Sequence, residues 1–267
     1  MNSPLLETRQ LRKSFGALIA TDGVDFDVRE GETHAVIGPN GAGKTTFIKQ
    51  LSGELRPDSG QVRFGEEDIT TLPAPQRSRK GLARSFQITS IYRDFSALEN
   101  VALAVQAQAG HSFQFWKAAR EDRALTGPAL HFLEQVFLDK RSAELAANLS
   151  HGEQRQLEVA MALATQPRLL LLDEPMAGMG TDESQRMIAL LASLKGQKTI
   201  VLVEHDMDAV FTLADRISVL VYGRIIATGT PEEIRANAEV RAAYLGEDPA
   251  SVFEIYLGKN FHGRADK

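Results

Sequence analysis

The sequence predicts an α/β fold with a mostly parallel sheet, and the pattern beyond Pro167 is the first observation that predicts it. Short apolar runs alternate there with segments of helical character. The runs cover residues 169–172, 199–203 and 217–221, and the helical segments cover about 182–194 and 206–214. Strands that alternate with helices pair in parallel, and a run that is apolar throughout indicates a strand covered on both faces.

The N-terminal part adds a β-rich region ahead of the first helix. Two short β-type runs, 24–28 and 34–37, flank the acidic turn 29–32 and predict a hairpin. A glycine-rich loop follows, and after it residues 46–51 suit a helix. Beyond a Pro-Asp-Ser-Gly break, a strand is expected at 61–64.

The middle of the chain has a different character from the parts around it. Residues 95–149 are rich in Ala, Leu, Glu, Gln and Arg with helical periodicity, which predicts a helical insertion in the α/β domain. We expect one domain over residues 1–247 and an appended tail over 248–267, in which 252–257 is an amphipathic stretch.

Composition narrows the class of protein. The chain of 267 residues is 43% hydrophobic and has 30 basic and 35 acidic side chains, so at a net charge of -5 nucleic acid is not an expected partner. The absence of cysteine excludes disulfides and thiolate metal sites. The start of the chain lacks a secretory signal, and no apolar run is long enough to cross a bilayer. Membrane-spanning helices, if the protein works at a membrane, are therefore expected in other subunits.

The residues after the run 34–37 carry the strongest functional motif. The segment GPNGAGKT, residues 38–45, fits the P-loop pattern G-x-x-x-x-G-K-[ST] between a predicted strand and a predicted helix. Its glycines let backbone N–H groups approach phosphates, Lys44 can neutralise the β- and γ-phosphates of ATP, and the Thr45 hydroxyl can coordinate Mg²⁺. The residues predicted to bind ATP in and beside this loop are Gly38, Pro39, Asn40, Gly41, Ala42, Gly43, Lys44, Thr45 and Thr46.

An acidic pair ends the predicted strand at 169–172. Asp173 is the expected partner of the Mg²⁺, and Glu174 is placed to orient the water that attacks the γ-phosphate. Taken alone, such a pair is more often a solvated strand end. Its combination with the P-loop predicts ATP hydrolysis.

These motifs resemble the ABC ATPase subunits of membrane transporters over about residues 5–247. The segment LSHGEQ, residues 149–154, is similar to that family's signature loop LSGGQ, although it is also a good helix N-cap. The resemblance implies a P-loop NTPase core with an N-terminal antiparallel β subdomain and a helical insertion subdomain. It also implies a head-to-tail dimer, in which the signature loop closes over the γ-phosphate of ATP held by the opposite subunit. The signature residues are then Ser150, His151, Gly152 and Glu153.

Three further residues take roles from the resemblance. Phe15 resembles the aromatic residue that stacks on adenine, and His205 resembles the switch histidine that touches the γ-phosphate. Gln87 resembles the glutamine that contacts Mg²⁺ and water and links the nucleotide site to the membrane partner. The implied catalytic residues are Glu174, His205 and Gln87, and the implied Mg²⁺ ligands are Thr45, Gln87 and Asp173.

One segment departs from the general family. Residues 177–181 have no carboxylate where the family often has the motif SALD, so the sequence does not say how the two sites of the dimer would be coupled without that Asp. Together with RSFQ at 84–87, EHDM at 204–207 and the ending from 229 to 247, this segment looks most like the ATPases of branched-chain amino acid importers.

The resemblance implies an ATPase subunit that powers import of a small polar solute, such as a branched-chain amino acid, at the cytoplasmic face of the inner membrane. The implied partners are transmembrane permease subunits, a second ATPase subunit that is a copy or a paralogue, and a periplasmic solute-binding protein. Residues 88–98 are the expected permease contact, in which Tyr92 and Phe95 either anchor a partner helix or pack in the core. The alternatives are the ATPase of a lipopolysaccharide-type exporter, a soluble ABC ATPase acting on nucleic acid or ribosomes, and a P-loop kinase.

Overall fold

The computed structural model describes residues 3–84, 91–109 and 122–245 of the chain. Within these residues the larger sheet has six strands, most of them parallel. In spatial order they are β10 (Arg224–Gly229), β9 (Arg216–Val221), β3 (Thr33–Ile37), β8 (Thr199–Val203), β7 (Leu169–Asp173) and β6 (Leu82–Arg84). The strands from β9 to β6 pair in parallel, whereas β10 is antiparallel to β9. The predicted mostly parallel sheet is confirmed.

A smaller antiparallel sheet is built from the N-terminal part of the chain. Its spatial order is β2 (Leu18–Val28), β1 (Leu6–Phe15), β4 (Ser59–Phe64) and β5 (Glu67–Asp68). Parts of β2 and β4 were predictable from the sequence, but β1 was not, because its residues 7–13 are mostly polar. This sheet is the antiparallel β region that the resemblance implied.

The predicted hairpin between residues 24–28 and 34–37 is wrong. β2 pairs with β1, whereas β3 pairs in parallel with β8 and β9, so the intervening turn carries the chain from one sheet to the other. All five residues of β3 are buried, which fits a strand covered on both faces better than a hairpin arm. Arg216 stabilises the crossing, because its guanidinium lies 2.6 Å from the carboxylate of Asp27 and 2.8 Å from that of Glu32.

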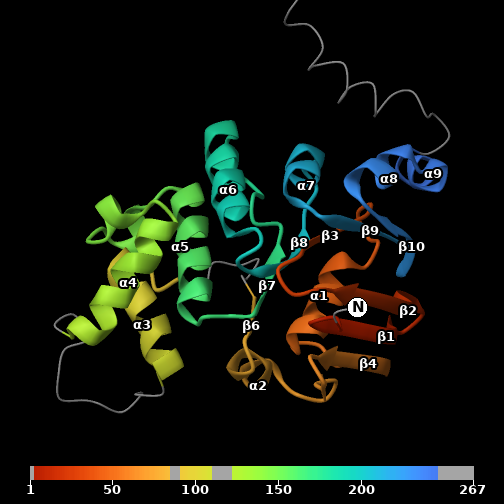
Figure 1. Ribbon diagram of the computed structural model, residues 1–267, viewed down its shortest axis with the longest axis horizontal. Helices are drawn as coiled ribbons and strands as arrows, with labels where there is room; N and C mark the ends of the chain where they lie inside the picture. The colour runs from red at the N-terminus through yellow and green to blue at the C-terminus, as the bar shows by residue number, and fades with distance from the viewer. Residues whose placement is uncertain (1–2, 85–90, 110–121, 246–267) are drawn as a thin grey trace, which may run out of the picture.

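Helix α1 (Lys44–Ser52) lies between the two sheets (Figure 1). Its apolar side chains share one core with residues from both sheets. Successive side chains of a strand point to opposite faces, so Leu171 of β7 faces this core whereas Leu170 and Leu172 face the helices on the other side. The strand that ends in Asp173 is therefore held from both faces.

Helix α2 (Ala74–Arg79) is held against the end of α1 by Arg77, which is almost fully buried. The Arg77 guanidinium donates hydrogen bonds to four backbone carbonyls. These belong to Gln50 (2.7 Å), Leu51 (2.8 Å), Thr70 (3.0 Å) and Leu72 (2.8 Å). The last carbonyls of a helix have no partner within it, and Arg77 satisfies two of those of α1.

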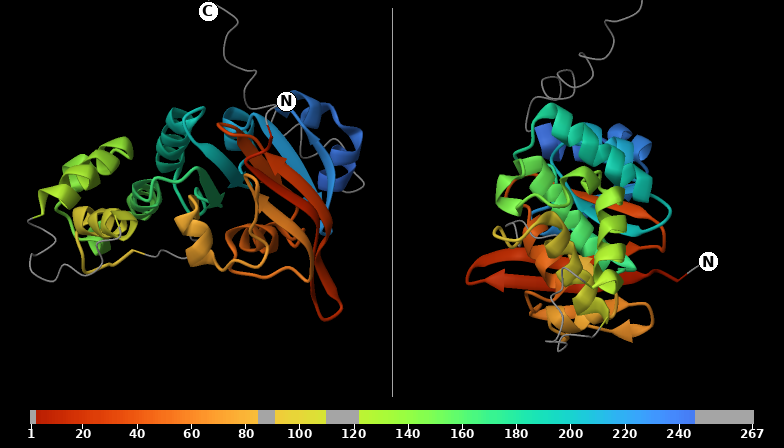
Figure 2. Two further views of the ribbon diagram at one scale, coloured as in Figure 1. Left: turned by 60° about the horizontal axis from the view of Figure 1, so that its bottom comes forward. Right: turned by 90° about the vertical axis from the view of Figure 1, so that its left-hand side faces the viewer.

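The face of the large sheet opposite α1 is covered by helices. Helices α5 (His151–Ala164), α6 (Thr181–Leu194) and α7 (Met207–Leu213) lie along it, and α8 (Pro231–Ala236) and α9 (Ala238–Leu245) pack beside β9 and β10. Figures 1 and 2 show α3, α4 and α5 on one side of the molecule and the two sheets on the other.

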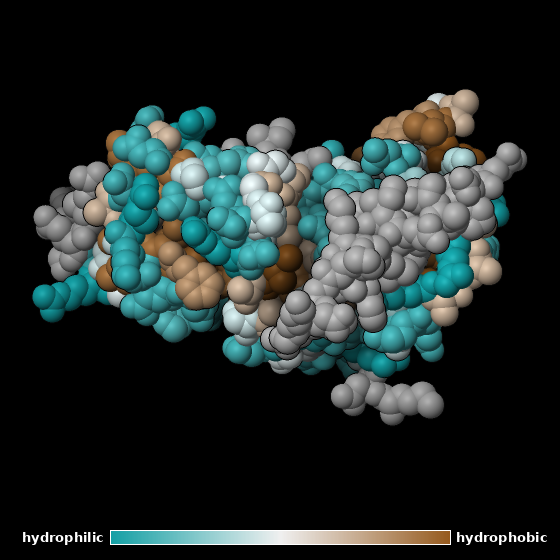
Figure 3. Space-filling view, turned by 90° about the horizontal axis from the view of Figure 1, so that it is seen from above, coloured by the Kyte–Doolittle hydropathy of each residue, from teal (hydrophilic) through white to brown (hydrophobic). Residues whose placement is uncertain are grey.

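The helical side is formed by α3 (Ala97–Ala109), α4 (Arg123–Gln135) and α5, with short 3₁₀ turns η2 (Asp139–Arg141) and η3 (Ala146–Asn148). Its surface mixes apolar and hydrophilic patches (Figure 3). The expected helical character of 95–149 agrees with these elements, while the domain limits at 1–247 and 95–149 stay predictions. The tail at 248–267 and its stretch 252–257 lie outside the described residues. Among the helices that are described, none has the length and apolar character needed to span a membrane.

Candidate functional site

The P-loop connects β3 to α1, and two of its glycines, Gly38 and Gly43, are required by the backbones packed behind it. Gly41 and Gly43 have φ values of 80° and 105°, in the region that favours glycine. A Cβ at Gly43 would lie 2.0 Å from the carbonyl oxygen of Ala20, and one at Gly38 would lie 2.1 Å from that of Leu220. Strands of both sheets therefore hold the loop in place.

A cavity of about 320 Å³ brings together most of the predicted ATP-binding residues. Phe15, Leu18 and Ala20 line one part of it, and Glu174 and His205 also reach it. The P-loop residues that line it are Asn40, Gly41, Ala42, Gly43, Lys44, Thr45 and Thr46. The cavity thus combines an exposed aromatic ring, a phosphate-binding loop and an acid–histidine pair.

Lys44 is buried at the start of α1 and is folded onto the loop. Its Nζ donates hydrogen bonds to the carbonyl oxygens of Gly38 (2.7 Å) and Pro39 (3.1 Å). Burial lowers the pKa of the Lys44 ammonium, and the carboxylates of Glu174 and Asp173 oppose this shift. Gly38 and Pro39 do not line the cavity themselves, but their carbonyl oxygens hold the ammonium of Lys44, which does line it.

Glu174 follows β7 and contacts His205, which follows β8. The His205 Nε2 lies 2.6 Å from the Glu174 Oε1. Glu174 has a φ of 52°, which is uncommon for a residue with a side chain, and its N–H donates to the Val203 carbonyl at 2.8 Å. Strained backbone of this kind is typical of functional sites, where the surrounding structure imposes it.

Glu204 supports both members of this pair, a role that sequence reasoning missed. Its buried carboxylate accepts hydrogen bonds from the backbone N–H of Met176 (2.9 Å) and from that of His205 (2.9 Å). Burial raises the pKa of Glu204, and these hydrogen bonds oppose the shift. Glu204 ties the segment after Glu174 to the segment of His205, and only its position as the first residue of the EHDM motif hinted at this role.

Asp173 is buried at the end of β7, and its two carboxylate oxygens differ. Oδ2 accepts a hydrogen bond from Nη2 of Arg84 at 2.9 Å, whereas Oδ1 is buried and has no hydrogen-bond partner in the described part of the chain. Burial raises the pKa of Asp173, and Arg84 opposes that shift. A buried carboxylate oxygen without a partner fits a metal ligand.

The donor set fits Mg²⁺ bound together with a nucleotide. Mg²⁺ prefers oxygen ligands and is usually held by one or two carboxylates plus substrate phosphates. Asp173 and Thr45 supply such oxygens, and no group of three or more His, Asp or Glu residues that could hold a metal alone occurs in the residues described. The third predicted ligand, Gln87, lies outside the described residues, so its metal and catalytic roles stay predictions.

The signature segment lies at the start of α5, apart from the cavity, which none of Ser150, His151, Gly152 and Glu153 lines. Ser150 caps the helix and forms a capping box with Glu153, so the N-cap reading is confirmed. The Ser150 Oγ also donates to Oε1 of Glu183 at 2.9 Å, and Nε2 of His151 lies 3.1 Å from the Ala177 carbonyl oxygen. Sequence reasoning missed Glu183, because this contact joins distant parts of the chain.

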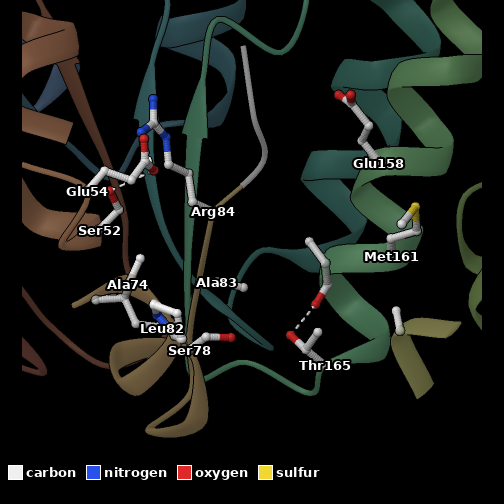
Figure 4. Close-up of a pocket in the computed structure, with 13 residues that line it drawn as sticks. Ser52, Glu54, Ala74, Ser78, Leu82, Ala83, Arg84, Glu158, Met161 and Thr165 are labelled. Carbon is white, nitrogen blue, oxygen red and sulfur yellow. Dashed lines mark hydrogen bonds and ion pairs between the residues drawn. The ribbon is translucent and has the colours of Figure 1, made fainter. Parts of the chain in front are cut away.

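A second, mostly apolar pocket of about 360 Å³ opens between the sheet side and α5. Figure 4 shows Arg84, Glu54 and Ser52 on one side of it and Glu158, Met161 and Thr165 on the other. The exposed rings of Tyr92 and Phe95 stack with their centroids 5.4 Å apart. They are 57% and 41% exposed, so core packing does not account for them.

This fold has a P-loop between the buried strand β3 and helix α1, and an acidic pair at the end of β7, which β8 separates from β3. These features define a nucleotide-binding protein of the P-loop class. Comparison with known proteins is more specific. Residues 21–177 match the family described as ABC transporter, and residues 224–250 match a family described as branched-chain amino acid ATP-binding cassette transporter. The chain belongs to the ABC transporter family, as an ATP-binding cassette.

Relatives match the chain over most of its length. The high-affinity branched-chain amino acid transport ATP-binding protein BraF of Pseudomonas aeruginosa is 40% identical over 254 residues, which are 92% of this chain and 100% of that protein. LivG of Escherichia coli, with the same description, is 38% identical over 259 residues, with the same coverage of 92% and 100%. The ADP conformation of an ATP-binding cassette of an ABC transporter superposes with a TM-score of 0.80 at 28% identity, covering 92% of this chain and 100% of that one.

Membership of this family confirms several predictions. The chain is an ATP-binding and ATP-hydrolysing subunit of an ABC transporter, and the fold is that of an ABC ATPase. A P-loop kinase is thereby excluded. The family acts with membrane subunits and binds a nucleotide, while the roles of individual site residues remain predictions.

Proposed function

We propose that this subunit powers import of branched-chain amino acids or related small polar solutes. The observation that carries the proposal is the match of residues 224–250 to the branched-chain amino acid cassette family, at the end of a chain that aligns with the whole of BraF. The cassette does not itself select a cargo, so the solute class comes from these relatives. The membrane subunits and a periplasmic binding protein would make that selection at the other face of the inner membrane.

In the proposed ATP site, each residue has a role that its surroundings support. Phe15 stacks on the adenine, and Lys44 turns its ammonium from the Gly38 and Pro39 carbonyls to the phosphates. Asp173 and Thr45 would hold Mg²⁺, which would neutralise charge on the phosphates. Glu174 orients the attacking water, and His205 holds the Glu174 carboxylate and contacts the γ-phosphate.

The proposed site is completed by a second ATPase subunit. The distance of the signature segment from its own cavity supports a head-to-tail arrangement, in which Ser150 and Gly152 approach ATP held by the opposite subunit. The N-terminus of α5 offers a partial positive charge to that phosphate. The second subunit is a copy of this chain or a paralogue.

We also propose where the membrane subunits dock. The apolar pocket is lined in part by Arg84, and the exposed Tyr92–Phe95 pair begins eight residues later in the sequence, just after the segment 85–90 that contains Gln87. Exposed aromatic residues are frequent anchors at protein interfaces. The cassette would thus lie at the cytoplasmic face of the membrane without entering it.

Reconstitution tests the proposal. The chain would be purified as a complex with its membrane subunits, and the complex would be reconstituted in liposomes. Uptake of radiolabelled leucine would then be measured with ATP either inside or outside the vesicles. We expect ATP on the cassette side to drive leucine toward that side, and a solute-loaded binding protein to raise ATP turnover. Movement away from the cassette would support an exporter, and co-sedimentation with ribosomes without membrane association would support a soluble ATPase.

A further inference from the structure

Arg84, the last residue of β6, connects two elements that carry predicted metal ligands. β6 pairs in parallel with β7, and Arg84 lies in register with Leu171. Since residues two apart on a strand share a face, Leu171 and Asp173 point the same way. Arg84 reaches Asp173 on that face, and its side chain is only 4% exposed.

The guanidinium of Arg84 divides its donors between two carboxylates. Nη2 donates to Oδ2 of Asp173 at 2.9 Å, and Nη1 donates to Oε1 of Glu54 at 2.5 Å. Glu54 follows α1, the helix that begins with Lys44 and carries Thr45, and its Oε1 also accepts from the Ser52 hydroxyl at 2.9 Å. One side chain therefore fixes the end of α1 to the end of β7.

This arrangement leaves Asp173 with one oxygen engaged and one available. Oδ2 is held by Arg84, while the buried Oδ1 has no partner among the described residues. An arginine suits this task because its planar fork fixes direction, whereas the ammonium of a lysine is a single flexible point charge. Residues that orient a ligating carboxylate determine how well it receives a metal.

We propose that Arg84 is the positioning residue of the metal-binding carboxylate: it holds Oδ2 of Asp173 so that Oδ1 faces the Mg²⁺ that accompanies ATP. The inference rests on the proposed role of Asp173 as a metal ligand. Arg84 does not line the nucleotide cavity, so its role would act through Asp173. Its removal should impair metal binding and leave metal-free nucleotide binding in place.

The test uses the full chain with Mn²⁺ as the spectroscopic probe. Mn²⁺ affinity in the presence of a non-hydrolysable ATP analogue is measured by electron paramagnetic resonance, and analogue affinity in EDTA is measured by calorimetry. Loss of a residue that orients a metal ligand typically costs about 10–100-fold in metal affinity, so we expect a fall of that size in Arg84→Met with little change in EDTA. Arg84→Lys should fall in between, because it keeps the charge but cannot bridge both carboxylates.

The matched control is Arg155→Met. Arg155 is a similarly buried arginine whose Nη1 lies 3.0 Å from Glu158, in a helix on the other side of the apolar pocket. Its removal should leave Mn²⁺ affinity unchanged. An equal effect in both variants, or an equal loss of affinity with and without metal in Arg84→Met, would mean that Arg84 only supports the fold.

Two further variants separate this inference from the proposed function. If Asp173→Asn weakens Mn²⁺ binding and the Arg84 variants do not, the metal ligand stands and the positioning role is wrong. If Asp173→Asn leaves Mn²⁺ binding intact, the metal assignment itself fails and the role of Arg84 fails with it. Should Arg84→Met not fold, Arg84→Lys and Glu54→Met decide the question, since Glu54→Met removes the acceptor that holds the Arg84 guanidinium and unchanged Mn²⁺ affinity in both variants would overturn the proposal.

Discussion

Replacing Glu174 by glutamine should stop ATP hydrolysis while leaving the site assembled. The substitution keeps the size of the side chain, and the glutamine Oε1 can still accept the hydrogen bond that His205 makes at 2.6 Å. The φ of 52° at this position strains Gln and Glu alike, because both have a Cβ, so the backbone cost is unchanged. Only the charge and the ability to accept a proton are lost.

The size of the effect follows from what the carboxylate does. A positioned group that assists proton transfer contributes about 10²- to 10⁴-fold to a rate. That range corresponds to about 2.7–5.5 kcal/mol of transition-state stabilisation. Nucleotide affinity should not fall, since Lys44 and the P-loop backbone are intact and the substitution removes a negative charge that would repel the phosphates.

Phosphate release at saturating ATP measures the loss of turnover, and size-exclusion chromatography with ATP measures the dimer that the variant should accumulate. Glu233→Gln is the control, because Glu233 caps α8 through the Thr230 N–H at 2.8 Å and does not line the nucleotide cavity. Turnover in Glu174→Gln close to that of the unsubstituted chain would refute the water-orienting role.

Substitutions at four other residues test other parts of the structure. Lys44→Ala should weaken ATP binding by about 10–100-fold in calorimetry, because hydrogen bonds to charged groups contribute about 1.5–3 kcal/mol. Phe15→Ala should cost about 1–3 kcal/mol of nucleotide affinity by the same method, as base stacking does, while Phe15→Trp should retain it. Arg77→Met strands two buried carbonyls of α1; at about 1–3 kcal/mol each, urea unfolding should show a loss of at least about 2 kcal/mol. Burial lowers the pKa of His34 to about 3. In the unfolded chain His34 binds a proton below a pH of about 6.5, whereas in the folded protein it stays neutral. The free energy of unfolding should therefore decrease by about 1.5–2 kcal/mol as the pH is lowered from 6.5 to 5. Urea unfolding at several pH values should show this decrease, and His34→Gln should make it smaller.

Each of these four predictions can be contradicted by a specific result. Unaltered ATP affinity in Lys44→Ala or Phe15→Ala would remove that residue from the nucleotide site. An Arg77→Met protein as stable as the unsubstituted chain would show that water satisfies the α1 carbonyls. A pH slope that is the same with and without His34 would mean that His34 is protonated in the folded protein.

The elements that the sequence predicted best are those whose signal is local. The runs 169–172 and 199–203 are apolar throughout, and the structure has strands Leu169–Asp173 and Thr199–Val203 there. The prediction of a hairpin at 24–37 was wrong because an acidic turn between two β-type runs is compatible both with a hairpin and with a connection between two sheets. Burial on both faces of β3 decides between them, and the apolar character of 34–37 alone does not show it.

The residues of the candidate site also fall into those that a local sequence pattern predicts and those that it does not. Motif residues such as Lys44 and Glu174 were predictable because the loop and the acidic pair are short continuous patterns, and the structure places both in one cavity. Arg84, Glu183 and Glu204 were not predictable, since their roles depend on which distant segments pack beside them. Gln87 was predicted but lies outside the described residues.

The carbonyl oxygens of Ala20 and Leu220, one from each sheet, leave no room for side chains at Gly43 and Gly38. The P-loop is consequently shaped by the packing of the sheets, before any nucleotide arrives, and the entropy of ordering it is lost during folding rather than at binding. ATP then meets a loop whose backbone at Gly38 and Gly43 is already fixed. Gly41 differs, because a Cβ there would meet open space, so among these three glycines its backbone is the one not restrained by a neighbouring strand.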